Sequence, residues 1–70
     1  MELSKLMADY NKKLARYYKM ADWEQNASHE DQLKLEKHIQ QVIDDCSQAL
    51  NRVQELRKVT LDEVVGGFTI

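Results

Sequence analysis

The residues whose types could support catalysis or metal binding are few, and their spacing brings none of them together. His29 and His38 lie nine positions apart, whereas two histidines that share a metal on one helix lie four apart. Asp44 and Asp45 are adjacent, so on a helix their side chains point about 100° apart and cannot share a substrate. We interpret these four residues as solvated side chains and predict no metal and no cofactor.

Cys46 is the only cysteine of the chain, which excludes an intrachain disulfide. It falls between Val42 and Ala49 on an apolar stripe, where cysteine behaves as a small buried hydrophobe. Burial in apolar surroundings raises the pKa of a thiol and makes it a poor nucleophile. Because the chain also has no recognisable pairing of a nucleophile with a base, we predict that it is not an enzyme.

A basic stretch with two aromatic residues leaves nucleic-acid binding open as an alternative. A positive groove with stacking aromatics is typical of such proteins, and the residues are Lys12, Lys13, Arg16, Tyr17, Tyr18 and Lys19. Both tyrosines, however, lie on or beside an apolar stripe, and the net charge of −2 is mild. We therefore interpret the basic residues as a solvated flank and consider nucleic acid an unlikely partner.

The element that must position these residues is an amphipathic helix with a heptad pattern. Its apolar positions step by four and three residues over six steps; they are Leu35, Ile39, Val42, Cys46, Ala49, Val53 and Leu56. Ile43 and Leu50 widen the stripe beyond what a two-stranded coiled coil needs. This pattern predicts a helix that other helices cover in a small bundle.

A second stripe with the same stepping predicts an earlier helix, over about residues 2–24. Its positions are Leu3, Met7, Tyr10, Leu14, Tyr17 and Ala21. Residues 25–28 break the pattern, and Ser28 reads as the N-cap of a helix over about residues 29–58. Because short connections place neighbouring helices antiparallel, we predict an all-α fold: an antiparallel two-helix hairpin that associates into a helical bundle.

The end of the chain changes character, so we divide it into a helical hairpin, residues 1–59, and a C-terminal turn with an apolar tail, residues 60–70. Thr60 and Glu63 predict a capping box, and Gly66 and Gly67 suit the left-handed end of a helical turn. The tail with Phe68 either folds back over the uncovered end of the second helix or docks on another chain, and we favour a protein partner. Trp23 has the same two interpretations, packing over the loop or anchoring a partner.

Length and composition favour association over catalysis. A chain of 70 residues buries only about 60% of its unfolded surface, so its own core is marginal. The chain is too polar for a membrane span and shows no apolar segment of the kind found in signal peptides. We expect a cytoplasmic protein that is reinforced by self-association or by a protein partner.

The helix pattern also resembles a known family. The segment DQLKLEKHIQQVIDDCSQALNRV, residues 31–53, follows a short polar turn and an amphipathic helix that contains KKLARYYK. Together they resemble the small type III secretion co-chaperones of the YscE/PscE-like family, in length, helix layout and turn placement over roughly residues 5–55. The resemblance implies a cytoplasmic hairpin that binds a chaperone and helps to hold a secreted needle subunit unpolymerised. It assigns no individual binding residue.

Two functions follow as hypotheses. The first is a small chaperone or co-chaperone that covers an apolar surface of a secretion-system partner. The second is a homo-oligomeric regulatory bundle, with nucleic-acid binding left open. For the first, the predicted partner-binding residues are Leu35, Ile39, Val42, Ile43, Cys46, Ala49, Leu50, Val53, Leu56, Trp23 and Phe68. Val42→Asp or Leu50→Asp is then expected to abolish binding, because the new carboxylate would have to be buried.

Overall fold

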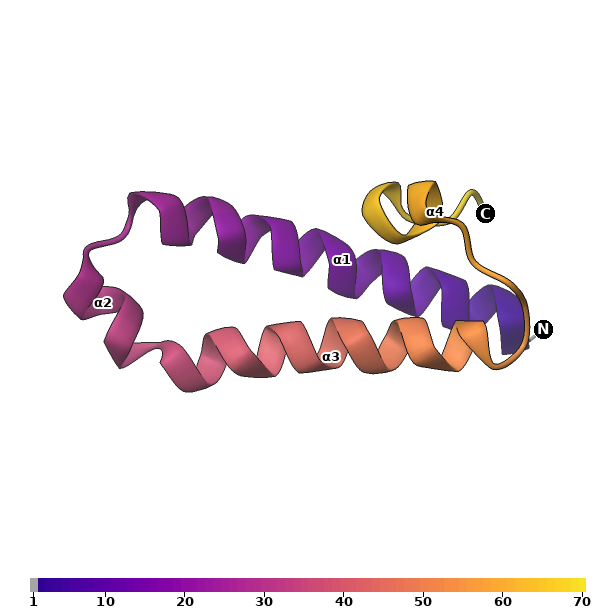
Figure 1. Ribbon diagram of the computed structural model, residues 1–70, viewed down its shortest axis with the longest axis horizontal. Coiled ribbons are helices and arrows are strands. Elements are labelled where there is room, and N and C mark those ends of the chain that lie inside the picture. Colours follow the sequence, from indigo (N-terminus) through magenta and orange to yellow (C-terminus); the bar gives the residue numbers. More distant parts are fainter. Residues whose placement is uncertain (1) are drawn as a thin grey trace.

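The computed structural model describes residues 2–70, and every regular element in that range is an α-helix (Figure 1). The helices are α1 (Glu2–Asn26), α2 (His29–Lys34), α3 (Glu36–Gln54) and α4 (Leu61–Gly66). The two long helices, α1 and α3, pack against each other, and α3 runs back alongside α1 (Figure 1). The predicted all-α fold class is confirmed for these residues.

The connection between α1 and α2 is shorter than predicted, because Gln25 and Asn26 still belong to α1. The Ser28 hydroxyl accepts a hydrogen bond from the Asp31 amide at 3.2 Å, so Ser28 is the N-cap that the sequence predicts. The Gln32 side-chain amide donates to the backbone carbonyls of Glu24 and Ala27, at 2.8 and 3.3 Å. These bonds brace the turn after α1, where the last helical carbonyls have no amide donor one turn ahead.

The prediction of one continuous helix over residues 29–58 is wrong in two respects. The helix is interrupted at Leu35, whose backbone has φ −105° and ψ 13°, although no proline or glycine marks the position. It also ends four residues early, at Gln54. Helix propensity differs between ordinary residues by less than about 1 kcal/mol, so at the Gln54 end tertiary contacts of the following segment override it.

Those contacts come from Arg57, which connects α3 to the tail. Its guanidinium donates two hydrogen bonds to the Glu63 carboxylate, at 2.9 and 3.2 Å, and lies 5.6 Å from the centre of the Phe68 ring. The hydrogen bonds from Arg57, together with the one from the Thr60 backbone amide, lower the pKa of the Glu63 carboxyl below its usual value. The predicted capping box is confirmed, since Thr60 and Glu63 each bond to the other's backbone amide.

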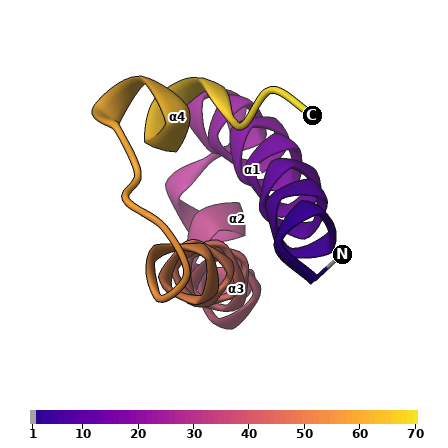
Figure 2. The same ribbon diagram turned by 90° about the vertical axis from the view of Figure 1, so that its right-hand side faces the viewer.

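Asn11 binds the tail from the other side. Its side-chain amide donates to the Phe68 carbonyl at 2.8 Å, and its side-chain oxygen accepts from the Phe68 backbone amide at 2.7 Å. Gly67 makes the turn between α4 and Phe68, with φ 87°. The tail therefore lies against α1, with α4 beside that helix in both views (Figures 1 and 2).

The hydrophobic core joins three segments of the chain. Its buried members come from α1, α3 and the tail, and they are Tyr10, Leu14, Ala49, Val53 and Phe68. The rings of Tyr10 and Phe68 meet edge to face, with centroids 5.4 Å apart. The segment over residues 60–70, which we predicted as a turn with an apolar tail, thus contributes to the same core as the two long helices.

The core occupies only part of a long molecule, whose extents are 42 × 19 × 17 Å. Beyond α4, toward α2, α1 and α3 diverge (Figure 1). Val42 is buried there, at 3% exposure, but it stands outside the main core cluster. The two ends of the helix pair are therefore covered unequally.

Candidate protein-binding grooves

The first candidate site is an apolar groove that α1, α3 and α4 enclose, which we call the α4 groove. Its volume is about 320 Å³. Its walls are almost entirely aliphatic and aromatic; they consist of Tyr10, Leu14, Tyr17, Tyr18, Ile43, Cys46, Ser47, Leu50, Val64 and Val65. Ile43, on α3, is 36% exposed at this groove, and Val65, on α4, is 56% exposed.

Two of the three tyrosine hydroxyls in the α4 groove already donate hydrogen bonds. Tyr10 donates to the Val64 carbonyl at 2.5 Å, and Tyr18 donates to the Val65 carbonyl. Both acceptors belong to the last turn of α4, whose carbonyls have no helical partner. Burial, and secondly the neighbouring Cys46, raises the pKa of Tyr10 to about 12, so its phenol stays protonated and keeps donating.

Cys46 lies half-buried in the α4 groove. Burial raises the pKa of its thiol, while the neighbouring Tyr10 side chain acts in the opposite direction with a smaller effect. This agrees with the interpretation of Cys46 as a small hydrophobe. A thiol in this environment lines the groove as an apolar surface.

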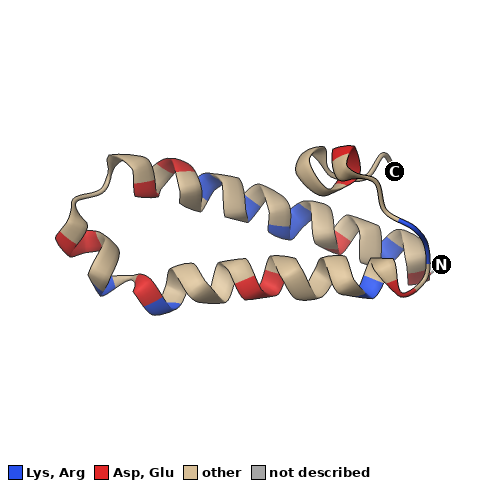
Figure 3. Ribbon diagram, in the orientation of Figure 1, with Lys and Arg blue, Asp and Glu red and all other residues tan. Residues whose placement is uncertain are grey.

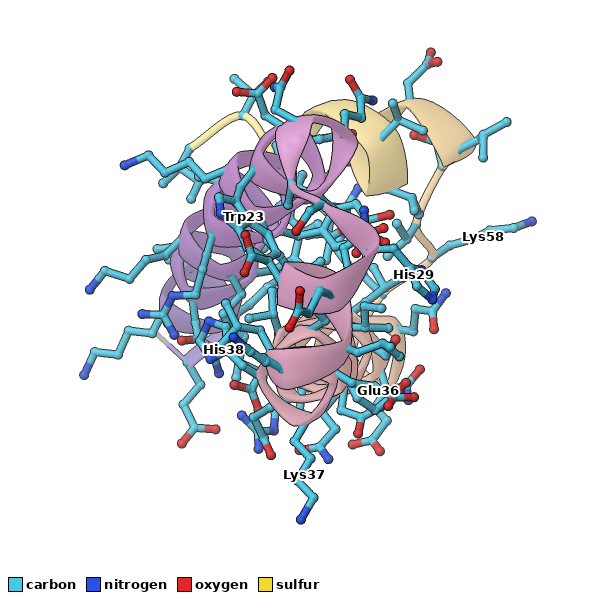
Figure 4. The ribbon with its side chains drawn as sticks, turned by 90° about the vertical axis from the view of Figure 1, so that its left-hand side faces the viewer. Trp23, His29, Glu36, Lys37, His38 and Lys58 are labelled. Carbon is cyan, nitrogen blue, oxygen red and sulfur yellow. The ribbon has the colours of Figure 1, made fainter. Side chains whose placement is uncertain are left out.

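The other residues with potential chemistry are not brought together. His29 and His38 lie on opposite sides of the helix pair (Figure 4). Asp44 and Asp45 each accept a hydrogen bond from a different glutamine one turn earlier, Gln40 and Gln41. Within residues 2–70 no group of three histidine, cysteine, aspartate or glutamate side chains is placed to hold a metal ion.

The second candidate site is a groove between α1 and α3 near α2, which we call the Trp23 groove. Its volume is about 310 Å³, and it is lined by Arg16, Lys19, Met20, Trp23, Leu35, His38 and Val42. Trp23 and His38 lie on one side of the helix pair and α4 on the other (Figure 4). The two grooves are therefore separate surfaces.

The basic stretch of α1 is divided in space. Lys13 forms an ion pair with Asp9 at 3.0 Å, and Lys12 lines a shallow depression with Lys5, Ala8 and Asp9. Only Arg16 and Lys19 reach the Trp23 groove. Figure 3 shows a run of basic segments in the middle of α1 with acidic segments on either side, and both signs of charge along α3.

The predicted partner-binding residues fall into three groups by exposure. Val42, Ala49, Val53 and Phe68 are buried, at 5% exposure or less, and Ile39, Cys46 and Leu50 are half-buried. The exposed ones are Leu35, Ile43, Leu56 and Trp23, between 36% and 55%. Phe68 packs against Tyr10 and is not at the surface, because the tail folds back onto α1.

Sequence reasoning missed several residues of the two grooves. It did not assign Val64, Val65 and the tyrosines to a site, since nothing in the heptad pattern places α4 over α1. The α1 wall of the Trp23 groove could have been found from the spacing of its residues in the sequence. Arg16, Lys19, Met20 and Trp23 follow i, i+3, i+4, i+7 spacing, which puts them on one face.

None of the helices within residues 2–70 combines the length and the apolarity that crossing a bilayer requires. No protein-family model, no curated protein and no solved structure matches the chain.

Proposed function

We propose that this chain is a non-enzymatic interaction protein whose α4 groove receives an apolar helix of a protein partner. The observation that carries the proposal is the groove itself, a cleft of about 320 Å³ with apolar walls that opens to solvent. In this proposal α1 and α3 form an antiparallel hairpin that the partner helix completes to a bundle. An amphipathic helix binds in such a groove through apolar side chains that lie about one turn apart.

The chemistry of the walls supports a helix as the occupant. The groove offers aromatic and aliphatic side chains, and its two hydrogen-bonding tyrosines, Tyr10 and Tyr18, already donate to α4. A small polar substrate would find few free polar groups to orient it. An apolar helix satisfies its own backbone and needs only apolar contact.

The family resemblance suggests which cellular role and which partner to propose. In that form the chain is a small chaperone or co-chaperone, and its partner is a secretion-system chaperone or a needle subunit. Its action would be to cover an aggregation-prone helix of that partner until the partner is needed. Large exposed apolar patches drive unwanted association, so covering them is a function in its own right.

The test uses Ile43→Asp, because Ile43 lines the groove and is already 36% exposed. The probe is a labelled amphipathic helical peptide with a leucine stripe and neutral glutamine flanks, and its binding is measured by fluorescence anisotropy. We expect binding at least about tenfold weaker than wild type, since a carboxylate in an apolar contact costs more than 1.4 kcal/mol.

The matched control is Gln48→Asp, which places the same carboxylate on the exposed surface of α3 outside the groove. It should bind the peptide as wild type does. Absence of peptide binding by the wild type, or equal binding by both variants, would overturn the proposal. Light scattering on the same samples identifies the case in which a second copy is the partner, because Ile43→Asp would then dissociate an oligomer.

A further inference from the structure

The Trp23 groove is formed by two facing helical stripes. The α1 stripe consists of Arg16, Lys19, Met20 and Trp23. The facing stripe consists of Leu35, which lies between α2 and α3, and of His38 and Val42 from α3. Val42 is buried and Met20 half-buried, so they form the interior. The exposed side chains at its edges are Arg16, Lys19, Trp23, Leu35 and His38.

The charge at this groove has one sign. No aspartate or glutamate lines it, although the chain has twelve acidic residues and a net charge of −2. The ion pairs within residues 2–70 use Lys13, Arg52 and Arg57. Arg16 and Lys19 take part in none of them, so their charges are available to an anionic group from outside.

We propose that the Trp23 groove binds an acidic amphipathic helix of a protein partner. Apolar side chains of that helix pack on Trp23 and Met20, and its flanking carboxylates pair with Arg16 and Lys19. Tryptophan and arginine are the residue types that most often dominate binding energy at protein interfaces. The inference rests on the proposed function in that both surfaces serve helical partners, but it concerns a separate surface and adds the partner's charge.

The alternative anionic partner, nucleic acid, fits the groove less well. A duplex presents a phosphate charge about every 1.7 Å of its axis and is bound by a track of cations. Here Lys13 is paired with Asp9, and Lys12 lies in another depression. The remaining two cations flank an apolar interior that a phosphate backbone cannot use, whereas an amphipathic helix uses both features.

The experiment compares two helical peptides that share one leucine stripe and differ only in their flanking residues, glutamate in one and lysine in the other. Trp23 is the only tryptophan of the chain and lines the groove, so its fluorescence reports binding there. We expect the glutamate peptide to bind about tenfold more tightly than the lysine peptide, with a difference that shrinks as salt is added.

The decisive variant is the double substitution Arg16→Glu and Lys19→Glu, which should reverse the preference of the two peptides. Its matched control is Lys12→Glu with Lys37→Glu, which makes the same charge change outside the groove; Lys37 points away from Trp23 and His38 (Figure 4). The control should keep the preference of the wild type. Circular dichroism checks that both proteins remain helical.

Three outcomes would overturn the inference. They are equal binding of the two peptides, a preference that survives in the Arg16→Glu, Lys19→Glu protein, and tighter binding of a double-stranded oligonucleotide than of the glutamate peptide. The proposed function fails separately. If the glutamine-flanked peptide still binds in a way that Ile43→Asp weakens, while the charged peptides show no preference, only this inference is wrong.

Discussion

Tyr10 links three parts of the molecule through one side chain. Its ring packs edge to face on Phe68 in the core, and its hydroxyl donates to the Val64 carbonyl at the end of α4. It is 1% exposed, and its pKa is raised to about 12, first by burial. A buried phenol that donates a hydrogen bond is costly to ionise, because the phenolate would lose both its solvation and its role as donor.

Tyr10→Phe is therefore expected to change how stability depends on alkaline pH. The unfolded chain releases the phenol proton near pH 10, whereas the folded protein holds it to about pH 12. Between these values the unfolded state binds fewer protons, so the free energy of unfolding of the wild type falls as pH rises. Tyr10 contributes at most about 3 kcal/mol to this fall. Tyr10→Phe lacks that contribution and keeps only the one from Cys46, whose thiol pKa burial also raises.

Urea unfolding at a series of alkaline pH values measures this effect. Near neutral pH, Tyr10→Phe should be about 1–3 kcal/mol less stable than wild type, because the Val64 carbonyl loses its donor. Tyr17→Phe, in the same groove, is the control and should keep the alkaline fall. An alkaline fall of equal size in the Tyr10→Phe protein would show that another group causes it.

Single residues also determine which substitutions can report on binding. The sequence suggested Val42→Asp as a test of the apolar stripe, but Val42 is 3% exposed. A carboxylate at that position would unfold the protein whether or not a partner exists. Ile43, its neighbour in sequence, is 36% exposed, so a charge there is compatible with folding and tests binding alone.

At the scale of the element, the C-terminal segment of residues 60–70, which contains α4 and Phe68, shows what sequence patterns predict and what they leave out. Caps are local, so Ser28, Thr60 and Glu63 could be assigned from sequence spacing alone. The end of α3 at Gln54 could not, because it coincides with contacts that Arg57 makes to Glu63 and Phe68 further along the chain, which no spacing rule predicts. The sequence also left open whether the tail folds back, since the partner of Phe68, Asn11, is 57 residues away.

The heptad pattern did not predict that the candidate site is divided into two grooves. A heptad pattern marks which side of a helix is apolar, but it does not say which part of that side another helix covers. It therefore grouped buried Val53 with exposed Leu56. The division into two grooves depends on where α4 lies, and that position is a tertiary property.

Within the tail, the two glycines are expected to respond differently to alanine. Gly67 has φ 87° and ψ 175°, a conformation that is essentially restricted to glycine. An added Cβ there would lie 2.7 Å from the Asn11 side-chain oxygen. Gly67→Ala should lower the free energy of unfolding by about 1–3 kcal/mol, as measured by urea titration.

Gly66→Ala is the matched control, since a Cβ at Gly66 meets nothing within 4 Å and Gly66 is the last residue of α4. It should be neutral or stabilising by up to about 1 kcal/mol, because alanine restricts the unfolded chain. Equal destabilisation by the two substitutions would contradict the proposed role of the Gly67 turn.

At the scale of the whole molecule, stability is distributed unevenly along the long axis of 42 Å. The core cluster of Tyr10, Leu14, Ala49, Val53 and Phe68 lies where α4 covers the helix pair. Toward α2 the side chains of Trp23, Leu33 and Leu35 are between 37% and 57% exposed. The Trp23 groove therefore lies in the region with fewer buried side chains, which opens most readily, whereas the α4 groove adjoins the core cluster through Tyr10 and Leu14.

The two hydrogen bonds between Asn11 and Phe68 make the Phe68 amide a probe of how often the tail detaches from α1. Its proton is held by the Asn11 side chain and is exposed to solvent only when the tail leaves α1. The exchange rate of this one amide in heavy water would therefore give the frequency with which the tail opens. We expect it to exchange faster than the amide of Val53, in the core of α3, because the tail can detach while α1 and α3 stay together. A ligand in the α4 groove that also touches Val64 and Val65 would slow the exchange of the Phe68 amide. A ligand in the Trp23 groove would leave that exchange rate unchanged.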